Sequence, residues 1–438
     1  MLELLRVYLR ATSWPIIVAM LALMSLSLLA VHQAEQADAD LAGYTVRQAI
    51  YVVLALAAFM AATAVHYQKV GRTAYLWFGL TLILLIVVLR LPEIRFSHRW
   101  IRLGPVQFQP SELAKLTYIL AMAWYLRYRD NYRRVLGLIP PFVLTVIPAG
   151  LILIEPDLGT TLLLFPTLLF MLFMAGAKLR HLGGVVAVAA AVILMPVPRP
   201  TEGMAPKELA RRKALAYWSG PVAGKDTLIL AAPLAKMHLH QLSRIEGWLR
   251  QSDKRVAADQ GFQLRQSLTL MGSGGLTGHG TGRAADLSLK LLPDDHTDFI
   301  YAVVGGQWGF VGAAGVLLIY VAIFICGAEI AAITQDPFGR LLVVGVLGLL
   351  FAQVFINVGM TMGLMPITGM TLPLVSFGGS SMVVNAVALG LLVNVGQRRA
   401  IVFGRRPFEF RSPPSDEQLA YNPILGDLSH RRNGSRKA

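Results

Sequence analysis

Acidic side chains and a histidine gather in one part of the chain, directly before a long apolar run. Asp294, Asp295, His296 and Asp298 precede residues 299–333, which are almost all apolar. A run of this length can cross a bilayer, so Asp298 is expected where water ends and hydrocarbon begins. Carboxylates and imidazoles in such a place can transfer protons or hold cations.

A structural role for these residues is equally compatible with the local sequence. Thr297 or Asp298 could cap the following helix, because a side-chain oxygen accepts a free backbone N–H and a negative charge suits the helix dipole. A cap needs only one such residue, however, and Asp294, Asp295 and His296 crowd the same place. This surplus favours chemistry over capping alone.

A second polar cluster consists of Arg99, Trp100, Arg102, Gln109, Ser111, Glu112 and Lys115. Its second half predicts a helix that starts at Pro110, where the missing N–H does no harm and Ser111 can help cap. Glu112 and Lys115 are three residues apart and therefore neighbours on one helical face. They form either a structural ion pair or part of a ligand site, and the sequence leaves both open.

Two more polar segments interrupt the apolar runs. Glu155 and Asp157 lie between two of these runs and could cap helices or bind a cation, and we favour the structural role. Residues 357–381 are rich in glycine and serine and include Ser380. Small residues let backbones and ligands approach closely in a membrane, although tight helix packing explains most of them.

The composition is that of an integral membrane protein. Of the 438 residues, 55% are hydrophobic and only 15% are charged, whereas soluble domains carry about 25% charged residues. The net charge of +15 comes mostly from particular loops and the tail, so we expect no nucleic-acid partner. The single cysteine, Cys326, lies in an apolar run and excludes a disulfide framework.

Apolar windows predict an all-α integral membrane protein, a polytopic bundle of about ten transmembrane helices. The predicted spans are residues 14–31, 50–65, 74–91, 113–125, 135–154, 160–177, 182–197, 299–333, 341–362 and 374–395. Lys and Arg collect before the first span and after the even-numbered spans, which places both termini in the cytoplasm. Arg95, Arg99 and Arg102 then lie outside, where we interpret them as facing an anionic group.

Residues 198–298 are predicted to form a large extracytoplasmic loop between the seventh and eighth spans. Within it, residues 207–218 predict a basic amphipathic helix lying on the membrane surface, and residues 239–249 predict another helix. We assign residues 1–401 to one membrane domain. Residues 402–438 form a basic cytoplasmic tail with the composition of a disordered segment.

Several motifs occur in order along residues 10–400. They are Arg99-Trp100-Ile101, Gln109-Pro110-Ser111-Glu112 with Lys115, Glu155-Pro156-Asp157-Leu158-Gly159-Thr160, Gln266-Ser267 with Gly272-Ser273-Gly274-Gly275-Leu276, Leu292-Pro293 with His296-Thr297-Asp298-Phe299, and Asn357-Val358-Gly359-Met360 through Gly378-Gly379-Ser380-Ser381. In these motifs the chain resembles the SEDS family (RodA, FtsW and the sporulation homologue). Members of that family are polytopic bacterial enzymes that polymerise peptidoglycan strands from lipid II.

The resemblance implies a peptidoglycan glycosyltransferase of the bacterial cytoplasmic (inner) membrane that releases undecaprenyl diphosphate during cell elongation or division. It implies Asp298 as the catalytic base. For substrate binding we predict Arg99, Trp100, Arg102, Glu112, Lys115, Ser273, His296 and Ser380. The diphosphate needs a positive charge, which could come from Arg99, Arg102 or Lys115, or from Mg²⁺ or Mn²⁺ held by Asp295 and Asp298.

Two short segments depart from the family's pattern. Asp294 and Asp295 follow Pro293, where the family usually has Pro-Glu before the histidine. Gly306 and Gln307 replace an expected pair of glutamates, so a carboxylate role is not carried over to them.

Two other functions are compatible with a polytopic bundle, namely a lipid II flippase and a non-catalytic scaffold. A flippase needs polar groups running through the bilayer, whereas the polar clusters here are predicted at its outer face. A scaffold would leave those clusters idle. The loop and tail lack the serine–lysine machinery of a transpeptidase, and the resemblance implies a class B penicillin-binding protein as the partner that supplies it.

Overall fold

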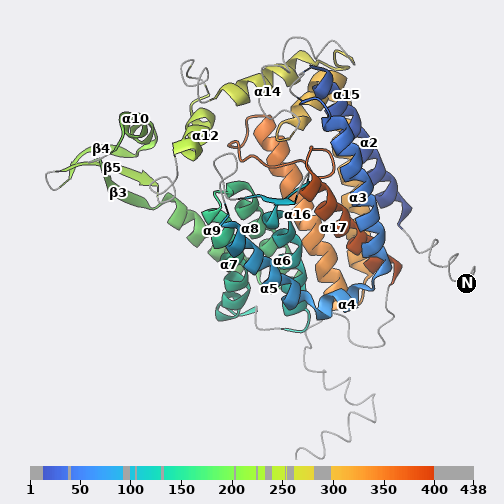
Figure 1. The fold of residues 1–438 in the computed structure, drawn as a ribbon. Helices are drawn as coiled ribbons and strands as arrows, with labels where there is room; N and C mark the ends of the chain where they lie inside the picture. The colour runs from blue at the N-terminus through green and yellow to red at the C-terminus, as the bar shows by residue number, and fades with distance from the viewer. Residues whose placement is uncertain are drawn as a thin grey trace, which may run out of the picture. The chain divides into compact units, whose positions relative to one another are not determined.

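The computed structural model describes residues 13–37, 41–91, 99–103, 106–129, 133–201, 204–222, 225–231, 239–251, 253, 261–280 and 297–398. In this part of the chain each predicted span coincides with a helix (Figure 1). The helices are α2 (Trp14–Ala37), α3 (Tyr44–Ala64), α5 (Ala74–Val88), α6 (Pro110–Leu126), α7 (Ile139–Ile154), α8 (Leu158–Ala175), α9 (Leu179–Leu194), α15 (Ile300–Ile333), α16 (Pro337–Thr361) and α17 (Gly379–Gln397).

Seven helical segments of the described chain are long and apolar enough to cross a membrane, namely those of α2, α3, α7, α8, α15, α16 and α17. The helices α5 and α9 are apolar but shorter. The helix α6 has 17 residues and carries Glu112 and Lys115. The protein is therefore a polytopic all-α membrane protein, as predicted. The number of ten spans stays a prediction.

The helices α16 and α17 form the core of the bundle. In the membrane-length windows of these two helices 72% and 78% of residues are buried, more than in any other such segment of the described chain. Small residues allow the close packing: Gly345 of α16 faces Ile119 of α6, and Gly390 of α17 faces Phe59 of α3. The outer helices instead expose large apolar side chains such as Val53, as lipid-facing surfaces require.

Between α9 and α15 the chain forms a small mixed unit that the sequence did not predict. Strands β3 (Pro196–Pro200), β5 (Lys225–Ala231) and β4 (Trp218–Val222) form an antiparallel sheet in that order. The helix α10 (Pro206–Leu215) precedes β4, and α12 (Leu239–Leu249) and α14 (Phe262–Ser273) follow β5. The predicted helix 239–249 is confirmed.

Two predictions for this unit are wrong. The predicted seventh span reaches residue 197, but Pro196 already pairs with Ala231 in the sheet. The helix predicted over 207–218 ends at Leu215, and its apolar side lies on the sheet rather than on a membrane. Leu215 is buried in a cluster with Leu228, Leu230 and Leu242, so the chain itself covers the apolar face of α10.

The glycine-rich segment after α14 is bonded to the first half of α15. At Gly309 the backbone of α15 leaves helical geometry, with φ 64° and ψ −161°. The N–H groups of Phe310 and Val311 are satisfied by the carbonyl groups of Gly275 and Leu276, at 2.9 and 3.1 Å. The glycines therefore let the backbone of this segment come close enough to α15 to bond its N–H groups at the kink.

The same packing accounts for the glycine that replaces an expected glutamate. A Cβ added at Gly306 would lie 2.6 Å from Cδ1 of Leu270, so a longer side chain would collide with α14. Gln307 is buried with 2% of its surface exposed.

Candidate active site

Asp298 lies in the turn directly before α15, and two buried side chains hold this turn by its backbone. Nδ2 of Asn357 donates to the carbonyl oxygen of Asp298 at 3.0 Å. The hydroxyl of Ser376 donates to the carbonyl oxygen of Thr297 at 2.5 Å. Asn357 belongs to α16, and Ser376 belongs to the segment that joins α16 to α17. The turn is therefore fixed by α16 and by the segment that follows it.

The N-cap position of α15 is Phe299, whose own side chain makes no cap hydrogen bond. Capping by Thr297 or Asp298 stays a prediction. Asp294, Asp295 and His296 lie outside the described residues, as does the side chain of Arg102.

Of the two alternatives for Glu112 and Lys115, the ion pair is present in α6. Nζ of Lys115 lies 2.9 Å from Oε1 of Glu112, and Lys115 is only 2% exposed. Its charge is therefore already offset within the helix. Ser111 does not cap α6, since the N-cap residue is Gln109 and makes no side-chain cap hydrogen bond.

Asp157 joins α6 to α8. As N-cap of α8 it accepts a hydrogen bond from the backbone N–H of Thr160 at 3.1 Å, which confirms the capping role favoured for this segment. Its second oxygen accepts from the hydroxyl of Ser111 and from Nε2 of Gln109, both at 3.2 Å. The start of α6 is thus tied to the break between α7 and α8.

Glu155, two residues earlier, is buried without such partners. Its side chain is 0% exposed, and neither carboxylate oxygen has a hydrogen-bond partner in the described part of the chain. Burial raises the pKa of Glu155 to about 8, and the negative charge of Asp157 adds to the effect, while Arg99 opposes it. Arg99 lies here because its guanidinium donates to the carbonyl oxygens of Glu155, at 2.9 Å, and of Pro156.

The other residues predicted to bind substrate fall in two places. Ser380, at the start of α17, accepts from the N–H of Gln109 at 3.1 Å and donates to the carbonyl oxygen of Gln107 at 3.2 Å. Gln107 belongs to β2 (Val106–Phe108), which pairs with β1 (Ile101–Leu103), and Trp100 directly precedes β1. Ser273 lies instead in α14, where its hydroxyl donates to a carbonyl of its own helix.

The segment between α16 and α17 brings the polar clusters together. A Cβ added at Gly159 of α8 would lie 3.1 Å from the carbonyl oxygen of Thr368. Gly369 directly follows Thr368, and a Cβ added at Gly369 would lie 3.3 Å from Oδ2 of Asp298. The start of α8 and the Asp298 carboxylate therefore approach the same short stretch of backbone.

One residue near Asp298 was missed by sequence reasoning. The Cβ position at Gly369 is also 3.2 Å from Nη1 of Arg244, which belongs to α12. No local motif marks Arg244, because its proximity depends on how α12 packs. The only available signal was the spacing of Arg244 and Trp248, which places them on one helical face.

The donor set around Asp298 is compatible with a hard divalent cation. The described residues contain no group of three or more His, Cys, Asp or Glu that could hold a metal on its own. Mg²⁺ is commonly held by one or two carboxylates together with waters and substrate phosphates. Asp298 can supply one such carboxylate, and the second predicted ligand, Asp295, lies outside the described residues.

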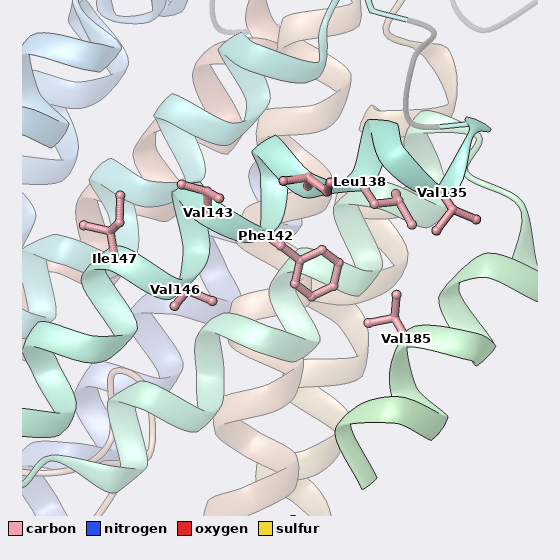
Figure 2. Close-up of a pocket in the computed structure, with 8 residues that line it drawn as sticks. Val135, Leu138, Phe142, Val143, Val146, Ile147 and Val185 are labelled. Carbon is pink, nitrogen blue, oxygen red and sulfur yellow. The ribbon is translucent and has the colours of Figure 1, made fainter. Parts of the chain in front are cut away.

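A separate cavity of about 410 Å³ lies between the start of α7 and α9 (Figure 2). Its lining is formed by η3 (Val135–Leu138), α7 and Val185 of α9, and every lining side chain is apolar. Figure 2 shows Phe142 and Val185 across from one another in this space. A hydrocarbon wall offers no group to transfer a proton or bind a phosphate, so this cavity is not the site of chemistry.

Residues 9–401 match the profile of the FtsW/RodA/SpoVE family, described as cell cycle proteins. The chain belongs to this family. Three curated FtsW/RodA/SpoVE relatives show the likeness over most of their lengths. The peptidoglycan glycosyltransferase RodA of Treponema pallidum is 30% identical, over 88% of this chain and 97% of its own. The probable peptidoglycan glycosyltransferase FtsW of Geobacter metallireducens is 32% identical, over 80% of this chain and 84% of its own. The peptidoglycan glycosyltransferase MrdB of Escherichia coli is 32% identical, over 76% of this chain and 80% of its own.

Solved structures agree with this assignment. A chain from a study of how a peptidoglycan synthase complex coordinates polymerization and crosslinking is 27% identical, with a TM-score of 0.69 over 89% of this chain and 99% of its own. The rod shape determining protein RodA of Thermus thermophilus is also 27% identical, with a TM-score of 0.60 over 89% and 97%. The FtsW/RodA/SpoVE fold therefore extends over the whole bundle.

Proposed function

We propose that the chain is a peptidoglycan glycosyltransferase that joins lipid II into glycan strands and releases undecaprenyl diphosphate. The observation that carries the proposal is Asp298, fixed by α16 at the start of α15 in a chain whose relatives are named as peptidoglycan glycosyltransferases. These names favour an enzyme over a lipid II transporter or a scaffold.

The reaction asks little of the protein beyond one base and one source of positive charge. The oxygen of the acceptor hydroxyl bonds to the anomeric carbon of the donor sugar. Asp298 takes the proton of that hydroxyl at the same time. The bond from that carbon to the diphosphate breaks, and its electron pair leaves on undecaprenyl diphosphate. Diphosphate is a good leaving group once its charge is balanced.

The substrate lies across the face that carries the polar clusters. The residues predicted to bind it are Arg99, Trp100, Arg102, Glu112, Lys115, Ser273, His296 and Ser380. The contacts of Arg99 with backbone carbonyls and of Lys115 with Glu112 support a positioning role for these two cations.

Asp298 and Asp295 would hold a divalent cation, Mg²⁺ or Mn²⁺, in this proposal. Such an ion would supply positive charge that balances the diphosphate. Polymerisation should then stop when EDTA removes divalent ions and return when Mn²⁺ or Mg²⁺ is added. Unchanged polymerisation in EDTA would remove the metal from the proposal and leave Asp298 as base.

The protein works in the bacterial cytoplasmic membrane, with both termini in the cytoplasm and a class B penicillin-binding protein as partner. The similarity to a chain of a complex that coordinates polymerization and crosslinking supports this partnership. Co-purification from native membranes should recover a penicillin-binding protein. Full polymerase activity of the chain alone, with no gain when any cognate penicillin-binding protein is added, would argue against it.

The direct test uses purified protein, lipid II and Mg²⁺ or Mn²⁺, with glycan polymer as the readout. Asp298→Asn should lower the rate by about 10²–10⁴-fold, the usual contribution of a general base, while the protein still inserts and binds the lipid substrate. Asp226→Asn, an exposed carboxylate of β5, is the matched control and should keep the parent rate. An Asp298→Asn protein that polymerises at the parent rate would refute the assignment of the base.

A further inference from the structure

Arg244 is placed beside Asp298 by α12 and the turn that follows it. Arg244 and Trp248 are four residues apart and share one side of α12, and Gln251 lies in the turn just after the helix. Nε1 of Trp248 and Nε2 of Gln251 both donate to the carbonyl oxygen of Gly363, at 3.1 and 2.9 Å. These bonds dock the end of α12 on the segment that follows α16, and Arg244 then reaches Gly369 of the same segment.

The geometry at Gly369 sets an upper limit on the separation of the two charges. The Cβ position there is 3.2 Å from Nη1 of Arg244 and 3.3 Å from Oδ2 of Asp298, so these atoms are no farther apart than the sum of the two distances. Gly369 has φ +71°, a conformation that favours glycine, and its lack of a side chain leaves the space between them open.

The guanidinium of Arg244 keeps its donors for a ligand. No hydrogen bond or ion pair joins it to another of the described residues. Arg99 and Lys115 are the two predicted cations whose side chains the structure describes, and both already have partners. Arg99 donates to backbone carbonyls, and Lys115 is buried against Glu112. Arg244 is therefore the described cation that faces Asp298 with unused donors.

We propose that Arg244 binds the diphosphate of the lipid-linked substrate next to the Asp298 carboxylate. This inference rests on the proposed function. A guanidinium presents a planar fork of donors that fits two phosphate oxygens at once. It stabilises the charge that grows on the diphosphate as the bond to the sugar breaks, and it offsets repulsion between that diphosphate and Asp298.

The first experiment measures binding without catalysis. The purified full chain in nanodiscs is titrated with undecaprenyl diphosphate, and with undecaprenol to account for the hydrocarbon chain. Arg244→Gln should weaken diphosphate binding by about tenfold or more, as expected for hydrogen bonds to charged groups. Arg244→Lys keeps the charge but not the fork and should show an intermediate loss. Undecaprenol binding should not change.

Arg250→Gln is the matched control, because Arg250 directly follows α12, is exposed and pairs with Asp253 at 2.9 Å. It should bind undecaprenyl diphosphate as the parent does. Equal diphosphate affinity in the parent and in folded Arg244→Gln would overturn the proposal. If Arg244→Gln does not fold, Arg244→Lys decides instead: a loss of about threefold or more supports the proposal, and parent affinity overturns it.

Polymerisation of lipid II separates this proposal from the general function. Arg244→Gln should raise the KM for lipid II by about tenfold or more. A parent protein that binds undecaprenyl diphosphate through Arg244 but forms no polymer would overturn the proposed function and leave the diphosphate site standing. If the parent polymerises lipid II and Arg244→Gln has the parent's KM, the role of Arg244 is overturned and the proposed function stands.

Discussion

Replacing Glu155 by glutamine should remove a large part of the pH dependence of stability. Glu155 is fully buried between α7 and α8, and its carboxylate oxygens have no hydrogen-bond partner in the described part of the chain. Burial, reinforced by Asp157, raises its pKa from an ordinary 4.5 to about 8. At neutral pH the folded protein therefore keeps this carboxyl protonated, whereas the unfolded chain ionises it.

The sign and size of the effect follow from this shift. Between the two pKa values the folded state binds more protons than the unfolded state, so the free energy of unfolding falls as the pH rises. Each pKa unit corresponds to about 1.4 kcal/mol, so the full shift amounts to roughly 5 kcal/mol. The stability that protonated Glu155 contributes is fully present below its ordinary pKa and is lost as the pH rises to about 8.

The assay compares unfolding free energies of purified parent and Glu155→Gln in mixed micelles at about pH 5 and about pH 8. The parent should lose several kcal/mol more than Glu155→Gln over this range. Asp226→Asn, an exposed carboxylate, should keep the parent's pH dependence. The same pH dependence in parent and Glu155→Gln would refute the assignment of a protonated, buried Glu155.

Three more substitutions test the packing around the site. Asn357→Ala leaves two buried carbonyl oxygens without their donor, so it should cost about 2–6 kcal/mol in unfolding free energy and lower the polymerisation rate; parent stability would show that these bonds contribute little. Gly278 has φ +80°, and Gly278→Ala forces a side chain against the backbone of Gln307. The substitution should lower the free energy of unfolding by at least about 1–3 kcal/mol. An unchanged melting temperature would contradict this packing. Trp248→Phe loses the bond to the carbonyl of Gly363 and should make α12 more accessible to limited proteolysis, at a cost of about 1 kcal/mol; a parent-like digestion pattern would show that α12 is docked otherwise.

The sequence by itself determined the features that depend on local spacing or on hydropathy. Runs of apolar residues identified the helices of the bundle, because a backbone in hydrocarbon must satisfy its own hydrogen bonds. The ion pair of Glu112 and Lys115 followed from a spacing of three residues, and the cap of α8 by Asp157 followed from its place before an apolar run. All of these are set within a few residues of the chain.

Contacts between distant segments were decided by the tertiary structure. The sheet β3–β5–β4 went unpredicted because β3 and β4 are short and include prolines, which are poor strand formers. The sequence did not indicate that the carbonyl groups of Gly275 and Leu276 accept hydrogen bonds from the N–H groups next to the kink at Gly309. That pairing exists only once the helix has bent.

The same distinction applies to the candidate site. Asp298 stood out from the sequence because acidic residues are concentrated before an apolar run. Arg244 did not, because it lies near Asp298 only once Trp248 has docked α12 on the segment that follows α16. Helix periodicity fixes which side chains share a face, but the packing of whole elements fixes what that face meets, and local sequence does not encode that choice.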